Sequence, residues 1–155
     1  MRRTGQAFLF AGIWLALGLF AYVYFQHRDS PPVRMLGAGR IELTRASDGH
    51  FHLDGRIDGK PVRFLIDTGA STVSVSQAMA GRIGLDCQHP SVFQTANGAV
   101  RGCMTRAAEV GFGPFVLADV AVAILPHLTS EPLLGMNALK AVRLEQDEDR
   151  LRMFR

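Results

Sequence analysis

The sequence predicts an all-β domain with one or two short helices, preceded by a single transmembrane helix. One long uncharged apolar run, Ala7 to Phe25, stands near the start of the 155 residues. Beyond about residue 48, apolar and polar residues alternate in short segments, which is the periodicity of half-buried strands. Asp-Gly and Asn-Gly pairs between these segments are typical of β-hairpin turns.

The N-terminal apolar run is long enough to cross a membrane. As a helix, residues 7–25 would span roughly 28 Å, close to the hydrocarbon thickness of a bilayer. A cleaved signal peptide is the alternative, because Met1-Arg2-Arg3 supplies a basic start. Signal peptides, however, carry a shorter apolar region that ends in small residues. This run closes on Tyr22-Val23-Tyr24-Phe25, so an uncleaved anchor is predicted.

Charge suggests the orientation of this anchor and excludes one class of partner. Arg2 and Arg3 favour a cytoplasmic tail over residues 1–6, although Arg28 and Arg34 compete on the other side. We therefore expect a single-pass protein of the inner membrane, with its domain in the periplasm or another extracytoplasmic space. All acidic residues follow the anchor, and no clustered basic face of the kind that binds nucleic acid is apparent.

A linker is predicted over residues 26–47, with a possible short strand at Arg40 to Thr44. Its prolines, glycines and charges show no sustained periodicity. The folded domain is expected over residues 48–155. It begins with two strands in "HFHLDGRIDGKPVRFLI", where the apolar positions alternate and Asp58-Gly59 marks the turn.

The elements that follow are short. Val73 and Val75 alternate with polar residues in a strand. Ser76 is a suitable cap for a brief helix in "QAMAGRIG", and Gly84 suits its C-terminal end. "SVFQTANGAVRGCMTRAAEVGF" is interpreted as two extended arms around Asn97-Gly98.

The last third of the chain combines one long strand with a short helical segment. "FVLADVAVAIL" is apolar almost throughout, which indicates a buried strand. In "EPLLGMNALKAV" two leucines precede a glycine turn, and Met136 to Lys140 are expected to form a helical turn or two. "VRLEQDEDRLRMFR" is interpreted as strand, charged turn and strand.

Cysteine and histidine usage leaves one question open. Cys87 and Cys103 would lie in an oxidising compartment, where a disulfide is plausible, but two buried free thiols are an alternative. Nothing marks Cys87 as an activated nucleophile, although His89 is near. His50 and His52 would share one face of a strand without a third ligand, so no metal site and no cofactor are predicted.

Asp67 stands directly after an apolar run, in "FLIDTGAS". An isolated Asp-Thr-Gly is ordinarily a capped turn. The match here is longer, because "FLIDTGAS" resembles the active-site segment of aspartic proteases and "PLLGMNAL" resembles their second hallmark. Order and spacing are similar to the retropepsin-like group, especially its bacterial members with an N-terminal membrane anchor. The resemblance covers about Gly49 to Arg155 and implies a single-lobe acid-protease β-barrel.

Peptide hydrolysis by this family requires two carboxyl groups. One takes a proton from water while the other, protonated, polarises the scissile carbonyl. Two carboxyls held about 3 Å apart share one proton, because both cannot ionise cheaply. The sequence offers one such residue, Asp67, so the second must come from another copy of the chain across a two-fold interface. The resemblance therefore implies a homodimer.

The resemblance also implies roles for the neighbouring residues. Thr68 would hydrogen-bond across the interface, and the Gly69 N–H would bind the carboxylate of Asp67. Support behind the loop would come from Ala70, Leu133, Leu134 and Gly135. The flap over the substrate would comprise Thr95, Ala96, Asn97, Gly98 and Ala99, with backbone hydrogen bonds to an extended peptide. A plain surface hairpin is the alternative for this last segment.

One departure from the viral pattern concerns the dimer. Viral enzymes follow the second-hallmark glycine with an arginine that stabilises their dimer, whereas this chain has Met136 and Asn137. Tethering both copies in one membrane would raise their effective concentration. The sequence predicts a membrane-anchored aspartic endopeptidase acting on a peptide or protein substrate. The alternatives are a tethered domain of this fold that binds or dimerises without cutting, and an anchor whose helix is the active part.

Overall fold

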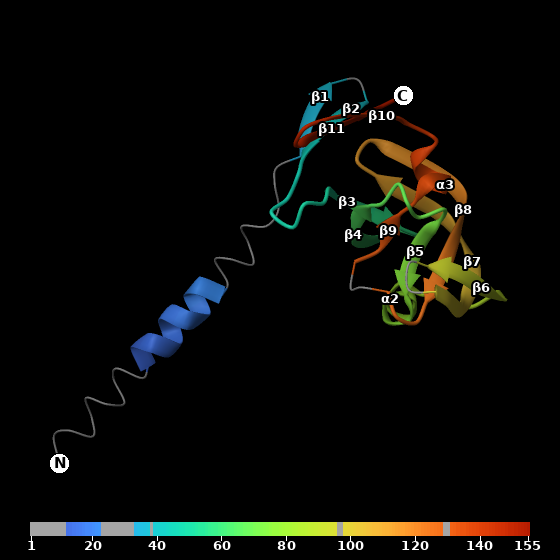
Figure 1. Ribbon diagram of the computed structural model, residues 1–155, viewed down its shortest axis with the longest axis horizontal. Helices are drawn as coiled ribbons and strands as arrows, with labels where there is room; N and C mark the ends of the chain where they lie inside the picture. The colour runs from blue at the N-terminus through green and yellow to red at the C-terminus, as the bar shows by residue number, and fades with distance from the viewer. Residues whose placement is uncertain (1–11, 23–32, 38, 96–97, 129–130) are drawn as a thin grey trace, which may run out of the picture. The chain divides into compact units, whose positions relative to one another are not determined.

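The computed structural model of the protein describes residues 12–22, 33–37, 39–95, 98–128 and 131–155 (Figure 1). The chain divides into two compact units, Met1–Pro31 and Pro32–Arg155. In the first unit, residues 12–22 form a helix with exposed side chains. None of the described helices combines the length and apolar character needed to cross a membrane. Both ends of the predicted span 7–25 lie outside the described residues, so the anchor stays a prediction.

The second unit contains a seven-stranded sheet whose order is β3-β4-β9-β5-β8-β7-β6. An additional pairing between β3 and β7, with Gly55 opposite Phe112, closes this sheet into a barrel and leaves β6 outside the ring. The strands are β3 (His52–Ile57), β4 (Lys60–Ile66), β5 (Val73–Ser76), β6 (His89–Thr95), β7 (Gly98–Phe112), β8 (Phe115–Leu125) and β9 (Leu133–Leu134). Closure removes the unpaired edges that an open sheet would expose.

The predicted first hairpin is confirmed. Asp58 and Gly59 form the turn between β3 and β4 with φ values of 48° and 75°, as a two-residue hairpin turn with both central residues left-handed requires. The Asp58 N–H donates to the Glu109 carbonyl at 2.9 Å, and the Asp58 carboxylate accepts from the Glu109 N–H at 2.8 Å. The tip of the hairpin is therefore fixed to β7.

Two short helices interrupt the strands. Helix α2 (Gln77–Ile83) begins where the Ser76 side chain accepts a 3.1 Å hydrogen bond from the Met79 N–H, and it ends at Gly84 with a φ of 80°. Both predicted caps are confirmed. Helix α3 (Met136–Leu139) follows β9 directly, as the sequence predicted.

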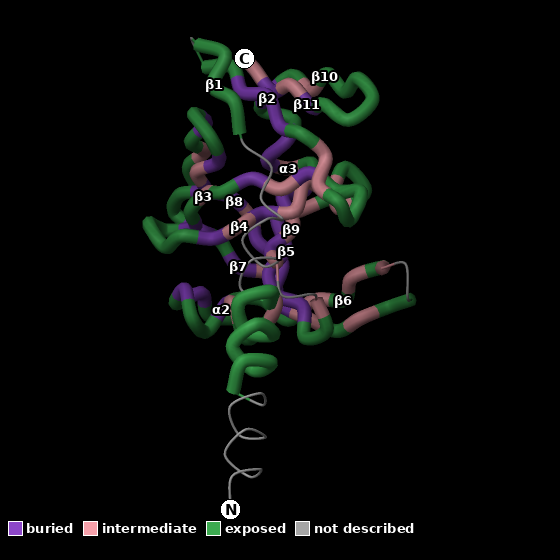
Figure 2. The backbone as a smooth tube through the Cα atoms, turned by 90° about the vertical axis from the view of Figure 1, so that its left-hand side faces the viewer, coloured by how far each residue is buried: buried purple, intermediate pink, exposed green. Residues whose placement is uncertain are grey.

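Strands β6 and β7 form the hairpin predicted around Asn97-Gly98. Thr95 lies opposite Gly98, and the pairing continues to His89 opposite Met104. The tip, residues 96–97, lies outside the described residues. Figures 1 and 2 place this hairpin and the four-stranded sheet at opposite ends of the second unit.

The four-stranded sheet combines both ends of the second unit. Its order is β1-β2-β11-β10, with β1 (Arg34–Gly37), β2 (Arg40–Thr44), β10 (Arg143–Asp147) and β11 (Arg150–Phe154). Ile41 and Leu43 are 0% and 1% exposed and join the same core cluster as Leu151 and Met153. The predicted linker 26–47 thus contains, from Arg34 onward, two strands that belong to the same compact unit as the barrel.

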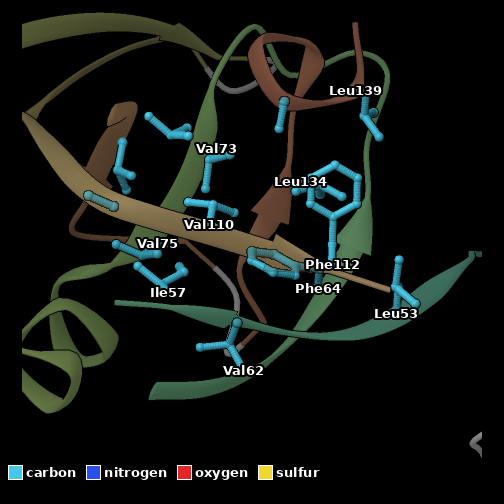
Figure 3. Packing of buried hydrophobic residues seen from close by; sticks show 14 of the residues in the cluster. Leu53, Ile57, Val62, Phe64, Val73, Val75, Val110, Phe112, Leu134 and Leu139 are labelled. Atoms are coloured by element: carbon cyan, nitrogen blue, oxygen red, sulfur yellow. The ribbon is translucent and has the colours of Figure 1, made fainter. Parts of the chain in front are cut away.

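The core fills the barrel. Leu53 and Phe64, picked out by the alternating pattern, are 2% and 0% exposed. In Figure 3 the side chains of Phe64, Val75, Val110 and Leu134, which come from four different strands, point into one shared interior. Along the tube in Figure 2, buried stretches recur on the barrel strands while the hairpin of β6 and β7 is mostly half-buried or exposed. The packed core therefore lies on one side of the loops that connect the barrel strands.

Cys87 and Cys103 form a disulfide, with their Cα atoms 5.5 Å apart. Of the two alternatives that the sequence left open, the structure supports the disulfide. The bond closes a loop that contains all of β6 and the start of β7. It therefore joins the two legs of that hairpin at its base.

Candidate active site

Asp67 is the first residue after β4. Its backbone N–H donates to the Leu134 carbonyl at 3.2 Å, which extends the parallel pairing of β4 with β9. On its other side β9 pairs with β5, where Leu133 lies opposite Ser74. The second hallmark is thus inserted between the two strands that enter and leave the Asp67 loop, and it holds both.

Backbone hydrogen bonds orient the Asp67 carboxylate. The Gly69 N–H donates to Asp67 Oδ1 at 2.9 Å, and the Ala70 N–H donates to the Asp67 carbonyl at 3.3 Å. The Asp67 side chain is half-buried, whereas Thr68 and Gly69 are exposed. The loop therefore presents a carboxylate of defined direction beside an exposed surface.

Gly135 crosses close behind this loop. A Cβ on Gly135 would lie 2.3 Å from the Thr72 carbonyl oxygen and 2.9 Å from that of Ala70. Its φ of −89° is available to any residue, so the position requires glycine for space and not for conformation. The next residue, Met136, donates its N–H to the Ala70 carbonyl at 2.8 Å. The hydrogen bond from Met136 to Ala70 forms because Gly135 lets the two backbone segments approach this closely.

Asn137 is a supporting residue that the sequence analysis noted only as a departure from the viral pattern. Its side-chain oxygen accepts from the Val73 N–H at 2.8 Å, and its amide nitrogen donates to the Ala121 carbonyl at 2.8 Å. Its backbone N–H donates to the Ser71 carbonyl at 3.0 Å. The side chain therefore joins β5 and β8, and the backbone of the same residue holds the end of the Asp67 loop. The available signal was an amide two residues after the second-hallmark glycine.

Replacing Asn137 by alanine is expected to lower the free energy of unfolding by about 2–3 kcal/mol, because two partly buried backbone groups lose their partner. Denaturant unfolding followed by circular dichroism measures this. The control is Gln146→Ala, which removes an exposed amide on β10 and is expected to change the free energy by less than about 0.5 kcal/mol. An equally small change for Asn137→Ala would contradict the bridging role.

A cavity of about 670 Å³ opens beside Asp67. The Asp67 loop forms one wall and the β6 arm of the hairpin forms another. The remaining lining is largely apolar and includes Leu125, Leu128 and Leu133. Among the described residues that line the cavity, Asp67 is the one carboxylate.

The predicted flap residues do not all line the Asp67 cavity. Thr95 lines the Asp67 cavity, together with Val92, Phe93 and Gln94. Gly98 and Ala99 lie on the β7 arm and are exposed without lining it. Residues 96–97 lie outside the described residues. Apart from Thr95, the sequence analysis did not single out the β6 arm, because its alternation of apolar and polar residues is that of any surface strand.

The surface beyond Thr68 carries a second, shallower hollow of about 330 Å³. Met136, 39% exposed, and Lys140 from the end of α3 line it together with the Asp67 loop. Among the described residues, no group of three or more histidine, cysteine or acidic side chains is arranged to hold a metal ion.

Comparison with known proteins identifies related chains. The profile of a family described as "gag-polyprotein putative aspartyl protease" matches residues 53–141, which include both hallmark segments. A protein encoded in the region 5′ of cobV in a Sinorhizobium species is 30% identical over 175 aligned positions, covering 97% of this chain and 75% of that protein. A Rickettsia prowazekii protein is 28% identical over 119 positions, covering 70% of this chain and 49% of that protein.

A solved structure also matches. The crystal structure of a retropepsin-like aspartic protease from Rickettsia conorii superimposes with a TM-score of 0.66 at 27% identity. The match covers 74% of this chain and 89% of that one. The shared part is therefore nearly the whole of the solved chain.

Proposed function

The chain belongs to the retropepsin-like aspartyl protease family, and from that membership we propose that it is a membrane-anchored aspartic endopeptidase that works as a homodimer. The observation that carries this proposal is the setting of Asp67. Its carboxylate is oriented by the Gly69 N–H at 2.9 Å and opens onto a cavity where no other described lining residue is a carboxylate. A half-site of this kind is complete when a second copy supplies the same group.

In the proposed mechanism, the two Asp67 carboxyls of the dimer lie about 3 Å apart and share one proton. The ionised carboxylate takes a proton from a water molecule, whose oxygen attacks the scissile carbonyl carbon. The protonated carboxyl donates a hydrogen bond to the carbonyl oxygen and stabilises the negative charge that develops there. Collapse of the tetrahedral intermediate then releases the amine, which receives a proton from the pair.

The dimer interface is proposed on the exposed surface beside the catalytic loop. A two-fold axis that brings two Asp67 side chains together also brings the hollow lined by Thr68, Met136 and Lys140 close to its own copy. Strand β11 is paired within its own chain to β2 on one edge and β10 on the other, so it has no free edge to offer. The exposed side chain of Met136 stands where the viral enzymes carry arginine.

Replacing Met136 by aspartate is expected to weaken the dimer at least about tenfold, because the axis places two new carboxylates near each other. Activity at low protein concentration falls in parallel, while the folded chain keeps its circular dichroism spectrum. Sedimentation velocity of the full chain in detergent measures the association. Val116→Asp is the control, since Val116 is 54% exposed on β8 and outside the hollow. Equal dissociation of both variants would contradict this interface.

Two observations support the proposed location outside the cytoplasm. The Cys87–Cys103 disulfide is a bond that persists in oxidising compartments and is rare in the cytosol. The apolar run of residues 7–25, with two arginines before it, has the features of an anchor whose N-terminus faces the cytoplasm. An extracytoplasmic protease domain is consistent with both.

Digestion of a peptide library by the full-length protein in detergent tests the function. We expect cleavage at some pH between acid and neutral that a statine-containing peptide blocks and a chelator does not. Complete resistance of the library over that pH range would contradict an enzyme and favour a domain that binds or dimerises without cutting. Cleavage insensitive to the statine peptide would contradict the aspartic mechanism.

A further inference from the structure

His52, at the start of β3, is held between two carboxylates. Its side chain is 9% exposed, with Nε2 2.8 Å from Asp48 Oδ2 and Nδ1 2.7 Å from Glu131 Oε2. The Asp48 contact is a hydrogen bond, whereas the Glu131 contact is an ion pair outside hydrogen-bond geometry. The imidazole therefore stands between the two carboxylates and contacts both.

Further groups around this cluster contact the two carboxylates. The His50 N–H donates to Asp48 Oδ1 at 2.9 Å, and this hydrogen bond is the main cause that holds the pKa of Asp48 below its usual value. Arg63 on β4 places Nε 3.7 Å from Glu131 Oε1. The His50 ring also bears on Asp48 electrostatically.

The cluster is connected to the wall of the Asp67 cavity. His52 lies opposite Leu65 across β3 and β4, and Leu65 lies opposite Leu133 across β4 and β9. Glu131 directly precedes Pro132, whose carbonyl accepts the Leu65 N–H at 2.8 Å. Leu133 lines the cavity beside Asp67. A contact that holds Glu131 therefore holds the segment entering β9.

We propose that His52 is a positioning residue of the active site, whose imidazole ties the segment entering β9 to the start of β3 and so fixes the Leu133 wall of the cavity. Arg63 provides a second and longer contact to Glu131. The consequence for a protease is substrate binding that depends on His52, separately from the chemistry of the Asp67 pair.

The first test rests on the proposed function and compares KM with kcat for the full chain in detergent. His52→Gln is expected to raise KM for a cleaved peptide several-fold while kcat changes little, because Leu133 lines the cavity and the Asp67 pair is untouched. His50→Gln, an exposed neighbour on the same segment, keeps the wild-type KM. A wild-type KM in His52→Gln would overturn the proposal.

The second test needs no activity. Amide hydrogen exchange of Leu65 and Asp67 reports the bonds to Pro132 and Leu134. After correction for intrinsic rates, His52→Gln is expected to lower their protection several-fold, whereas the amide of Leu151 in the other sheet is unaffected. Unchanged protection would overturn the role of His52 even in an active protease. Lowered protection without any peptide cleavage would support that role and contradict the proposed function instead.

Discussion

Replacing Asp67 by asparagine is expected to reduce peptide hydrolysis by about a thousandfold or more, because the amide can neither take a proton from water nor share one with its twin. The substitution conserves side-chain volume, and the amide oxygen can still accept from the Gly69 N–H. The fold and the dimer should therefore survive. Initial rates on a cleaved peptide, measured across the pH range, give the loss. The control is Asp54→Asn, which alters an exposed acid on β3 and leaves the rate unchanged.

Mixing wild-type and Asp67→Asn chains tests whether both copies contribute. If each active pair needs two aspartates, the activity of a re-equilibrated mixture falls as the square of the wild-type fraction, to about a quarter in an equal mixture. A linear fall, to about half, would indicate that each chain works alone. The measurement therefore distinguishes an active site that needs two carboxylates from one that needs a single carboxylate.

Replacing Gly135 by alanine is expected to destabilise the protein by about 3 kcal/mol or more and to abolish activity. The added Cβ would stand 2.3 Å from the Thr72 carbonyl oxygen and 2.5 Å from its carbon, and neither backbone atom can move without displacing the loop that carries Asp67. The hydrogen bond from Met136 to Ala70 would stretch as well. Thermal unfolding and peptide cleavage measure the two effects.

Gly81→Ala is the matched control for this substitution. Gly81 lies in α2 with no atom within 4 Å of an added Cβ, so alanine should stabilise that helix by up to about 1 kcal/mol. The same substitution is thus expected to destabilise the protein at position 135 and to stabilise it at position 81. A Gly135→Ala variant as stable as the Gly81→Ala variant would contradict the close crossing of β9 behind the catalytic loop.

Local features of the fold could be predicted from the sequence because the backbone itself encodes them. The Asp58-Gly59 turn, the Ser76 cap and the left-handed Gly84 each depend on residues within one turn of the chain. Alternation likewise identified Leu53 and Phe64 as core residues. Strand β1 was missed because all four of its residues are exposed, so that its pairing with β2 and not its own pattern makes it a strand.

The residues of the candidate site also divide into those that the sequence alone made recognisable and those that it did not. Asp67 and the second hallmark were recognisable because each stands in a contiguous run of residue types. The Asn137 bridge was not, since its partners Val73 and Ala121 are distant along the chain. The β6 arm that lines the cavity could not be told from the β7 arm, because the turn at Asn97-Gly98 specifies a hairpin and not the face that it presents.

For this protein, short-range order along the chain determined most of the strands, the turns and caps and the identity of the carboxylate. Only the tertiary structure decided what surrounds that carboxylate: the insertion of β9 between β4 and β5, the pairing of Cys87 with Cys103 and the carboxylate pair around His52. The physical reason is distance along the chain. Backbone preferences act within a few residues, whereas these contacts join segments that meet only after the barrel has closed.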